Sequence, residues 1–190
     1  ASRKVLKRFT LAAPASLATA GDGRHVLATM GSRNRVKVID GGSWSVPHGE
    51  HAHRYVRAPR GGAAISVKKP SHVVAHGSRI AIFADGDGVA TVIPQATIAR
   101  GARGAQRVRT GTAHHGVAVP LGARTVVSVK APGAGEGMPG QLAVAGPNGR
   151  LESARIACPA MHGEATLGAT RALFACADGY VVVDASKPKV

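Results

Sequence analysis

The sequence predicts an all-β chain made of four-stranded antiparallel blades of a β-propeller. Its 190 residues include 25 Gly and 11 Pro, with short Val-rich runs between these turn-forming residues. Such a composition is typical of β-strands joined by tight turns. A segment that begins with histidine also recurs at His72, His115 and His162. Its spacing of roughly 45 residues matches one propeller blade.

The recurring segment divides the chain into repeat units, each of which reads as a β-meander. We expect an orphan strand and four units at approximately residues 3–11, 12–58, 68–110, 111–156 and 157–190. Asp-Gly turns between β-branched runs, as in Ala84–Gly88, support the hairpins within these units.

We expect a single propeller domain or propeller segment, and the question is whether its ring closes. Four blades are the lower end of the known range, so we expect about four blades of a larger ring. The alternative is that the orphan strand completes the fourth unit, which ends after its third strand near Ala185, and closes a four-bladed ring.

The formal net charge of +15 raises the question of a nucleic-acid partner. The basic residues are scattered, without a run of five, and aromatic residues make up only 3% of the chain. Binders of single-stranded nucleic acid stack bases on aromatic side chains. We therefore expect a solvated basic surface that can meet an acidic partner or an anionic membrane face, and no nucleic acid. No apolar run approaches the roughly 20 residues of a membrane span, so we expect a soluble chain.

The two cysteines, Cys158 and Cys176, lie just before the first strand of the fourth unit and at the end of its second strand. Antiparallel strands can bring these positions together, so we expect a disulfide and an oxidising compartment. The alternative is a pair of buried free thiols in a cytosolic protein.

The recurring histidines predict a metal site. A residue at one fixed place in each blade lies on one ring around the propeller axis, so His72, His115 and His162 can converge on a zinc ion. A fourth ligand position would remain for water, a carboxylate or another histidine. Candidates for that position, or for carboxylates that orient the ligands, are His114, Glu164, Asp85 and Asp87. Alternatively, the three histidines hydrogen-bond backbone groups where each blade begins.

A second group, His48, His51 and His53, lies in a polar, glycine-bearing connection between the first and second units. Histidine-rich loops can wrap a cation such as zinc if their backbone is flexible. The alternative is an exposed loop without a metal.

Several motifs together resemble the AztD family of periplasmic zinc metallochaperones. They are Val38-Ile-Asp-Gly-Gly-Ser-Trp44, Pro47-His-Gly-Glu-His-Ala-His53, Lys69-Pro-Ser-His-Val-Val74, Ile82-Phe-Ala-Asp-Gly-Asp-Gly88, His114-His-Gly-Val-Ala-Val-Pro-Leu-Gly122 and Cys158-Pro-Ala-Met-His-Gly-Glu164. The resemblance implies a β-propeller longer than this chain, Zn²⁺ as cargo, a periplasmic or extracellular location, and the zinc-binding protein of an ABC importer as partner. It also implies that His48, His51 and His53 belong to a mobile loop and that the other three histidines stand at blade entries.

We therefore expect a zinc chaperone that is not an enzyme, in which the loop histidines replace the ring ligands one at a time. The second hypothesis is a zinc-dependent hydrolase or lactonase on a propeller, because zinc with three histidine ligands can generate hydroxide near neutral pH. No general base or oxyanion device is recognisable in the sequence. The third hypothesis is a metal-free propeller that serves as an interaction scaffold.

Overall fold

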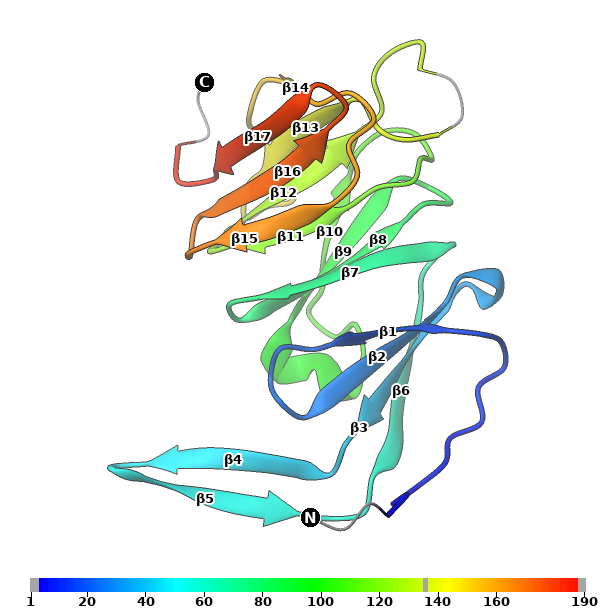
Figure 1. Ribbon diagram of the computed structural model, residues 1–190, viewed down its shortest axis with the longest axis vertical. Helices are drawn as coiled ribbons and strands as arrows, with labels where there is room; N and C mark the ends of the chain where they lie inside the picture. Colours follow the sequence, from blue (N-terminus) through cyan, green and yellow to red (C-terminus); the bar gives the residue numbers. More distant parts are fainter. Residues whose placement is uncertain (1–3, 135–136, 188–190) are drawn as a thin grey trace.

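The computed structural model describes residues 4–134 and 137–187. Its regular structure is almost entirely β-strand, with two short 3-10 helices, η1 (Gly31–Arg33) and η2 (Gln95–Arg100). Neither helix is long or apolar enough to cross a membrane. Within the described residues, the strands form three sheets of four strands, one of three and one of two, and the four larger sheets follow one another along the molecule (Figure 1).

The predicted all-β class with four-stranded antiparallel blades is confirmed. The first blade contains β1 (Ser16–Thr19), β2 (His25–Met30), β3 (Arg35–Asp40) and β6 (Arg60–Ser66). The second contains β7 (Pro70–His76), β8 (Arg79–Ala84), β9 (Val89–Pro94) and β10 (Gln106–Arg109). The third contains β11 (Ala118–Leu121), β12 (Arg124–Val129), β13 (Gln141–Ala145) and β14 (Ile156–Ala157). The fourth contains β15 (Glu164–Leu167), β16 (Arg171–Cys176) and β17 (Gly179–Asp184).

Neighbouring blades meet through their first strands. Strand β7 packs against β1 and β2 on one side and against β11 on the other, and β11 also packs against β16. His76 links three blades, because its ring nitrogens lie 2.8 and 2.9 Å from the carbonyl oxygens of Pro120 and Gly168. The starts of these first strands therefore lie together in one region, and their ends lie together in another.

The core lies between the blades. Both β8 and β9 are buried over nearly their full length, because a central blade is covered on both faces. Short, continuous apolar runs such as Ile-Ala-Ile-Phe suit that position. Leu27, Ile80 and Ile82 pack between the first two blades, and Leu142 and Phe174 between the last two.

Two predictions about the N-terminal part of the chain are wrong. Residues 4–11, within the expected orphan strand at 3–11, contain no strand. A strand needs a hydrogen-bonded neighbour, and none of the described strands pairs with this segment. The first sheet also runs past the expected unit boundary at residue 58 to Ser66. Gly62 allows β6 to lie close to β3, since a Cβ there would be 3.2 Å from the carbonyl oxygen of Val38.

The histidine-bearing segment also differs from the prediction. It is a paired β-hairpin of β4 (Ser43–His48) and β5 (His51–Val56), and it is inserted between β3 and β6 of the first blade. We expected an irregular connection between the first and second units. In both arms of the hairpin, aromatic, valine or histidine side chains occur at every second position, as on one face of a strand. The arms meet at a turn with Gly49 in the left-handed region, at φ 57°.

The predicted disulfide between Cys158 and Cys176 is confirmed, with a Cα–Cα distance of 4.9 Å. It joins the end of β16 to the segment that leads from β14 to β15. Strand β14, which precedes that segment, has only two residues. The disulfide therefore anchors the segment in place of a longer strand.

We predict that a Cys158→Ala, Cys176→Ala double variant unfolds with a free energy about 3 kcal/mol below that of the parent, because the crosslink restricts the unfolded chain. Urea unfolding without reductant measures the difference. Reductant should lower the unfolding midpoint of the parent and leave the variant unchanged. An unchanged parent midpoint would contradict a stabilising bond.

Candidate functional site: two histidine groups

The three recurring histidines converge at one end of the first strands. His72 lies near the start of β7, while His115 and His162 lie in the segments just before β11 and β15. One ligand atom from each of the three lies within 4.8 Å of the others, and the Nε2 atoms of His72 and His115 are 3.2 Å apart. We call these residues the histidine trio.

The spacing of the trio suits a metal ion. Nitrogen ligands about 2.0–2.1 Å from a tetrahedral zinc lie about 3.3–3.4 Å apart. The separation of 3.2 Å between the His72 and His115 nitrogens is close to that value. The ring of His162 has its centroid 6.1 Å from that of His72 and 6.0 Å from that of His115, and one of its nitrogens lies within 4.8 Å of a ligand atom of each, so it can reach the same ion.

Two carboxylates stand behind the trio. Asp85 Oδ2 lies 2.7 Å from His115 Nδ1, and Glu164 Oε1 lies 3.7 Å from His72 Nδ1. A carboxylate at Nδ1 keeps the proton on that nitrogen and leaves the Nε2 lone pair for a metal. The Glu164 carboxylate also raises the pKa of His72 above its ordinary value, although burial opposes the shift.

Asp85 is itself held in place by its own blade and by the next one. Its Oδ1 accepts hydrogen bonds from the Ser71 hydroxyl and, at 3.3 Å, from the Gly116 backbone N–H. Gly116 has no room for a side chain, because a Cβ there would lie 2.5 Å from the Phe83 ring. The backbone can therefore come close enough to fix the carboxylate that orients His115.

The other two candidates from the sequence lie elsewhere. His114 is buried, and its ring nitrogens lie 2.8 Å from the Thr112 carbonyl oxygen and 3.2 Å from the Ser128 hydroxyl. His114 therefore links the Thr112 backbone to the Ser128 side chain in the core. Asp87 is exposed and lines a separate surface hollow with Asn34 and Arg107. Asp85 and Asp87 lie two residues apart in the same turn, and only Asp85 faces the trio.

The segment that carries His162 is fixed at several points. The disulfide holds Cys158, the Met161 N–H donates to the Pro139 carbonyl at 3.1 Å, and the His162 N–H donates to the Ala175 carbonyl at 3.1 Å. Met161 is buried beside the trio. The third histidine is thus placed by a crosslink and backbone bonds although no strand contains it.

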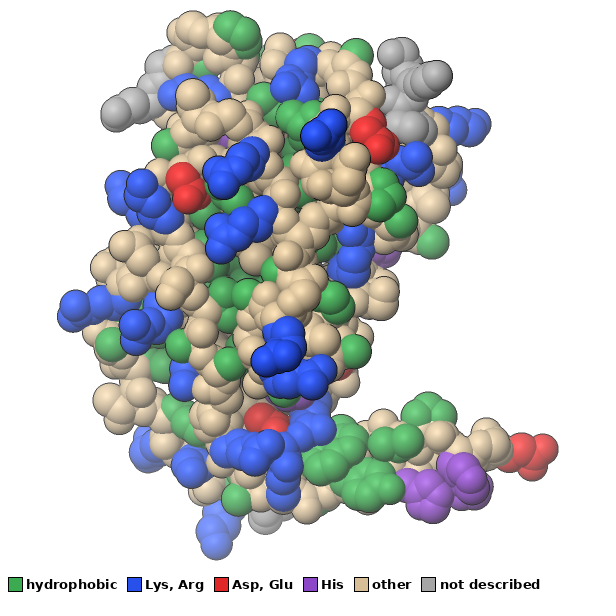
Figure 2. All heavy atoms as spheres, turned by 180° about the vertical axis from the view of Figure 1, so that it is seen from behind, with side chains coloured by type: hydrophobic (Ala, Val, Ile, Leu, Met, Phe, Trp, Pro, Cys, Tyr) green, Lys and Arg blue, Asp and Glu red, His purple; other side chains and the backbone are tan. Residues whose placement is uncertain are grey.

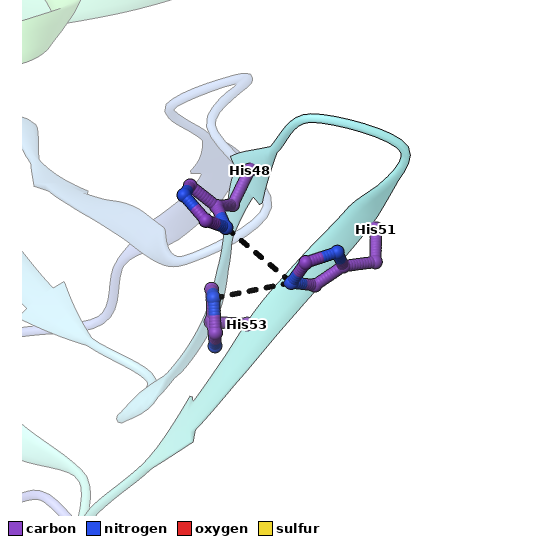
Figure 3. Close-up of side chains that lie close together, drawn as sticks. All are labelled: His48, His51 and His53. Carbon is purple, nitrogen blue, oxygen red and sulfur yellow. Dashed lines mark hydrogen bonds between the residues drawn. The ribbon is translucent and has the colours of Figure 1, made fainter.

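The second histidine group lies on one face of the β4–β5 hairpin. His48 pairs across the strands with His51, and His53 follows two residues later on the same face. His51 Nε2 is 3.4 Å from His48 Nδ1 and 3.3 Å from His53 Nε2, and the three rings point toward one another (Figure 3). These separations also match a tetrahedral zinc site. All three residues are exposed, and we call them the hairpin histidines.

The root of the hairpin is fastened to the first blade by Asp40. Arg24 donates from Nε and Nη2 to the two Asp40 oxygens, each at 2.9 Å. The Gly42 N–H, just before β4, and Arg57, just after β5, bind the same carboxylate. The Arg24 guanidinium holds the pKa of Asp40 well below its ordinary range. Both ends of the hairpin are therefore tied to one buried group.

An aromatic stack continues from this root along the histidine face. The Arg24 guanidinium lies 3.9 Å from the centroid of the Trp44 ring, which stacks on Tyr55 with centroids 5.3 Å apart. Figure 2 shows the hairpin projecting from the body with histidine side chains near its tip. Sequence reasoning missed this hairpin although its signal was present, since Trp44, Val46 and His48 occur at every second position, as residues on one face of a strand do.

The two histidine groups lie at opposite ends of the blades. His72, near the start of β7, borders a hollow with Ser16 of β1, whereas the hairpin root borders a hollow with Ser78, beyond the end of β7. The seven residues of β7 span about 20 Å at roughly 3.3 Å per residue. The expected direct replacement of ring ligands by the hairpin histidines does not fit this arrangement.

Comparison with known proteins identifies relatives over almost the whole chain. The zinc chaperone AztD of Citrobacter koseri is 31% identical over 179 residues, which are 94% of this chain and 42% of that protein. The crystal structure of Citrobacter koseri AztD superposes with a TM-score of 0.86 at 29% identity, and that of apo AztD from the same organism with 0.85 at 28%. Both matches cover 94% of this chain and 48% of the other. No protein-family model matches.

The predicted resemblance to the AztD chaperones is thereby confirmed. The chain spans about half the length of these relatives. They are named for a chaperone and not for an enzyme, which agrees with the non-enzymatic role expected from the sequence.

We predict that Glu164→Gln lowers the pKa of His72, because the carboxylate that stabilises its imidazolium is removed. NMR titration of the histidine ring signals in metal-free protein measures the midpoint. Glu152→Gln, which removes a carboxylate paired with Arg124, serves as the control and should leave His72 unchanged. Equal midpoints for His72 in the parent and Glu164→Gln would refute the assignment.

Proposed function

We propose that this chain, as a relative of the AztD zinc chaperones, is part of a protein that binds Zn²⁺ and passes it to an acceptor. The observation that carries the proposal is the convergence of His72, His115 and His162, with Asp85 and Glu164 behind two of them. Three oriented imidazoles supply three nitrogen ligands, and the fourth position is left for water or an incoming ligand. The trio would hold the ion tightly, because its residues are placed before the metal binds.

The hairpin histidines would form a second, weaker site. Their side chains are exposed, and no carboxylate bonds to them among the described residues. Binding there must order exposed side chains, which opposes tight binding. A site at the tip of a projecting hairpin is accessible to another protein, so ligand exchange with an acceptor can occur there without a bare ion.

Hydrolysis is a weaker explanation of the same geometry. A zinc hydrolase needs a base or acid near the metal-bound water. The two carboxylates near the trio contact the Nδ1 atoms of its histidines, on the side away from the Nε2 ligand atoms. They are therefore placed to orient ligands.

The proposed cellular setting follows from the relatives and the crosslink. A disulfide is maintained in an oxidising compartment, so we place the protein in the periplasm or outside the cell. Its acceptor would be the zinc-binding protein of an ABC importer, and the net charge of +15 suits an acceptor with an acidic surface.

Replacing any member of the trio should weaken tight zinc binding by at least about tenfold, because each supplies one of three ligands to one ion. Competition titration with a chromophoric chelator compares His72→Ala, His115→Ala and His162→Ala with the parent. The control replaces all three hairpin histidines with alanine and should keep the tight site while losing a weaker equivalent of zinc. Three trio variants with parental affinity would show that these histidines are structural.

The same hairpin variant should transfer zinc more slowly to the importer's binding protein, because its accessible exchange site is gone. Stopped-flow transfer to that protein is compared with transfer to a small chelator, which reports simple dissociation. Dissociation to the chelator from the trio should be unaffected. An unchanged rate of transfer to the binding protein would remove the hairpin from the mechanism.

A further inference from the structure

The end of the blades opposite the trio carries an arginine from each blade. These residues stand at or immediately before the start of the second strand of every blade, and they are Arg24, Arg79, Arg124 and Arg171. Equal phase in each repeat brings them to the same end of the sheets, as it does for the trio at the other end. Few acidic side chains accompany the Lys and Arg residues on the face shown in Figure 2.

The charges of this arginine row are only partly matched. Arg24 pairs with Asp40, and Arg124 pairs with Glu152 at 3.2 Å. Arg79 makes no salt bridge within residues 4–134 and 137–187, and the one hydrogen bond of its side chain there goes from Nη2 to the Arg124 carbonyl. Burial without a carboxylate lowers the pKa of Arg79. A half-buried guanidinium without a counter-ion is costly, and an external carboxylate would relieve that cost.

Arg79 borders a hollow of about 590 Å³ between the hairpin root and the second blade. We call it the arginine hollow, and its lining includes Arg24, His25, Trp44, Ser45, Ser78 and Arg79. Two buried atoms of this lining, Arg79 Nε and His25 Nε2, have no hydrogen-bond partner in the described part of the chain. Surrounding atoms cover both, so a ligand in the hollow would meet the outer nitrogens of the Arg79 guanidinium.

The charges around the hollow favour an acidic ligand. The outer nitrogens of the Arg79 guanidinium are donors and need an acceptor such as a carboxylate oxygen. Asp22, which lies 2.6 Å from His25 Nδ1, is the one carboxylate among the lining residues, and Arg24 and Arg79 outnumber it. Trp44 and Pro94 give the same hollow an apolar part. An acidic peptide matches both features, with carboxylates for Arg79 and side-chain carbon for the apolar part.

We propose that the arginine hollow is a docking site for an acidic peptide segment of a partner protein. Trp44 and Ser45 of the hairpin form part of its wall, so a segment bound there would lie at the root of the hairpin that carries the histidines. Docking itself requires no metal. The inference rests on the proposed zinc transfer only in that the docked partner would receive the ion. Peptide docking and zinc transfer can therefore fail separately.

The experiment uses zinc-free protein and a fluorescein-labelled peptide rich in glutamate, with the same peptide carrying glutamine for glutamate as control. Fluorescence anisotropy should show binding of the acidic peptide that weakens as salt is raised, and none of the glutamine peptide. Equal binding of both peptides, or binding of neither, overturns the proposal.

The decisive variant is Ser78→Glu, which places a negative charge on the exposed rim of the hollow and leaves every arginine in place. The substitution should lower the affinity for the acidic peptide by about fivefold, as expected for one repulsive charge at the rim. Ser78→Gln controls for size. Ser32→Glu in η1 controls for net charge, because it lies on an exposed turn away from the hollow. Both controls should bind as the parent does, with unchanged thermal unfolding.

Two further outcomes would overturn the proposal. An equal loss in Ser32→Glu and Ser78→Glu would show that only net charge matters. Binding of vesicles that contain phosphatidylglycerol, weakened by Ser78→Glu while the peptide does not bind, would assign the hollow to a membrane surface. Zinc affinity of Ser78→Glu should equal that of the parent, which separates this test from that of the trio.

Discussion

The packing of each blade's first strand against its neighbours is the constraint on which the rest of the structure depends. Strand β7 lies between β1 and β11, and the apolar side chains of the sheets fill the space between blades. Because the repeat unit has the same phase in each blade, equivalent residues come to the same end. The trio gathers at one end for this reason, and the arginine row lies at the other.

The two ends differ in how they treat charge. At the trio, Asp85 and Glu164 face histidine Nδ1 atoms, so negative charge stands behind ligands that would meet a cation. At the other end, Asp40 is shared by Arg24 and Arg57, and positive charge remains in excess. One end therefore suits a metal ion and the other an acidic surface. The hairpin histidines project from the basic end, where a protein attracted by charge would meet them.

Covalent and ionic ties hold the elements that packing alone leaves loose. His162 lies outside any strand and is fixed by the disulfide and by backbone bonds, while the two strands of the hairpin are largely exposed and are fixed at their root by Asp40. Both histidine groups therefore depend on a connection outside the repeated sheet. A blade alone would not place either of them.

The sequence by itself determined the blade class, the trio and the disulfide, because repeat phase and strand alternation are local patterns that carry over directly into space. Tertiary structure decided what the period cannot encode. It selected Asp85 over Asp87, since only one side of the turn faces the next blade, and it placed His114 in the core. It also set the hairpin at the far end from the trio and left Arg79 without a counter-ion, because both depend on which blade ends meet.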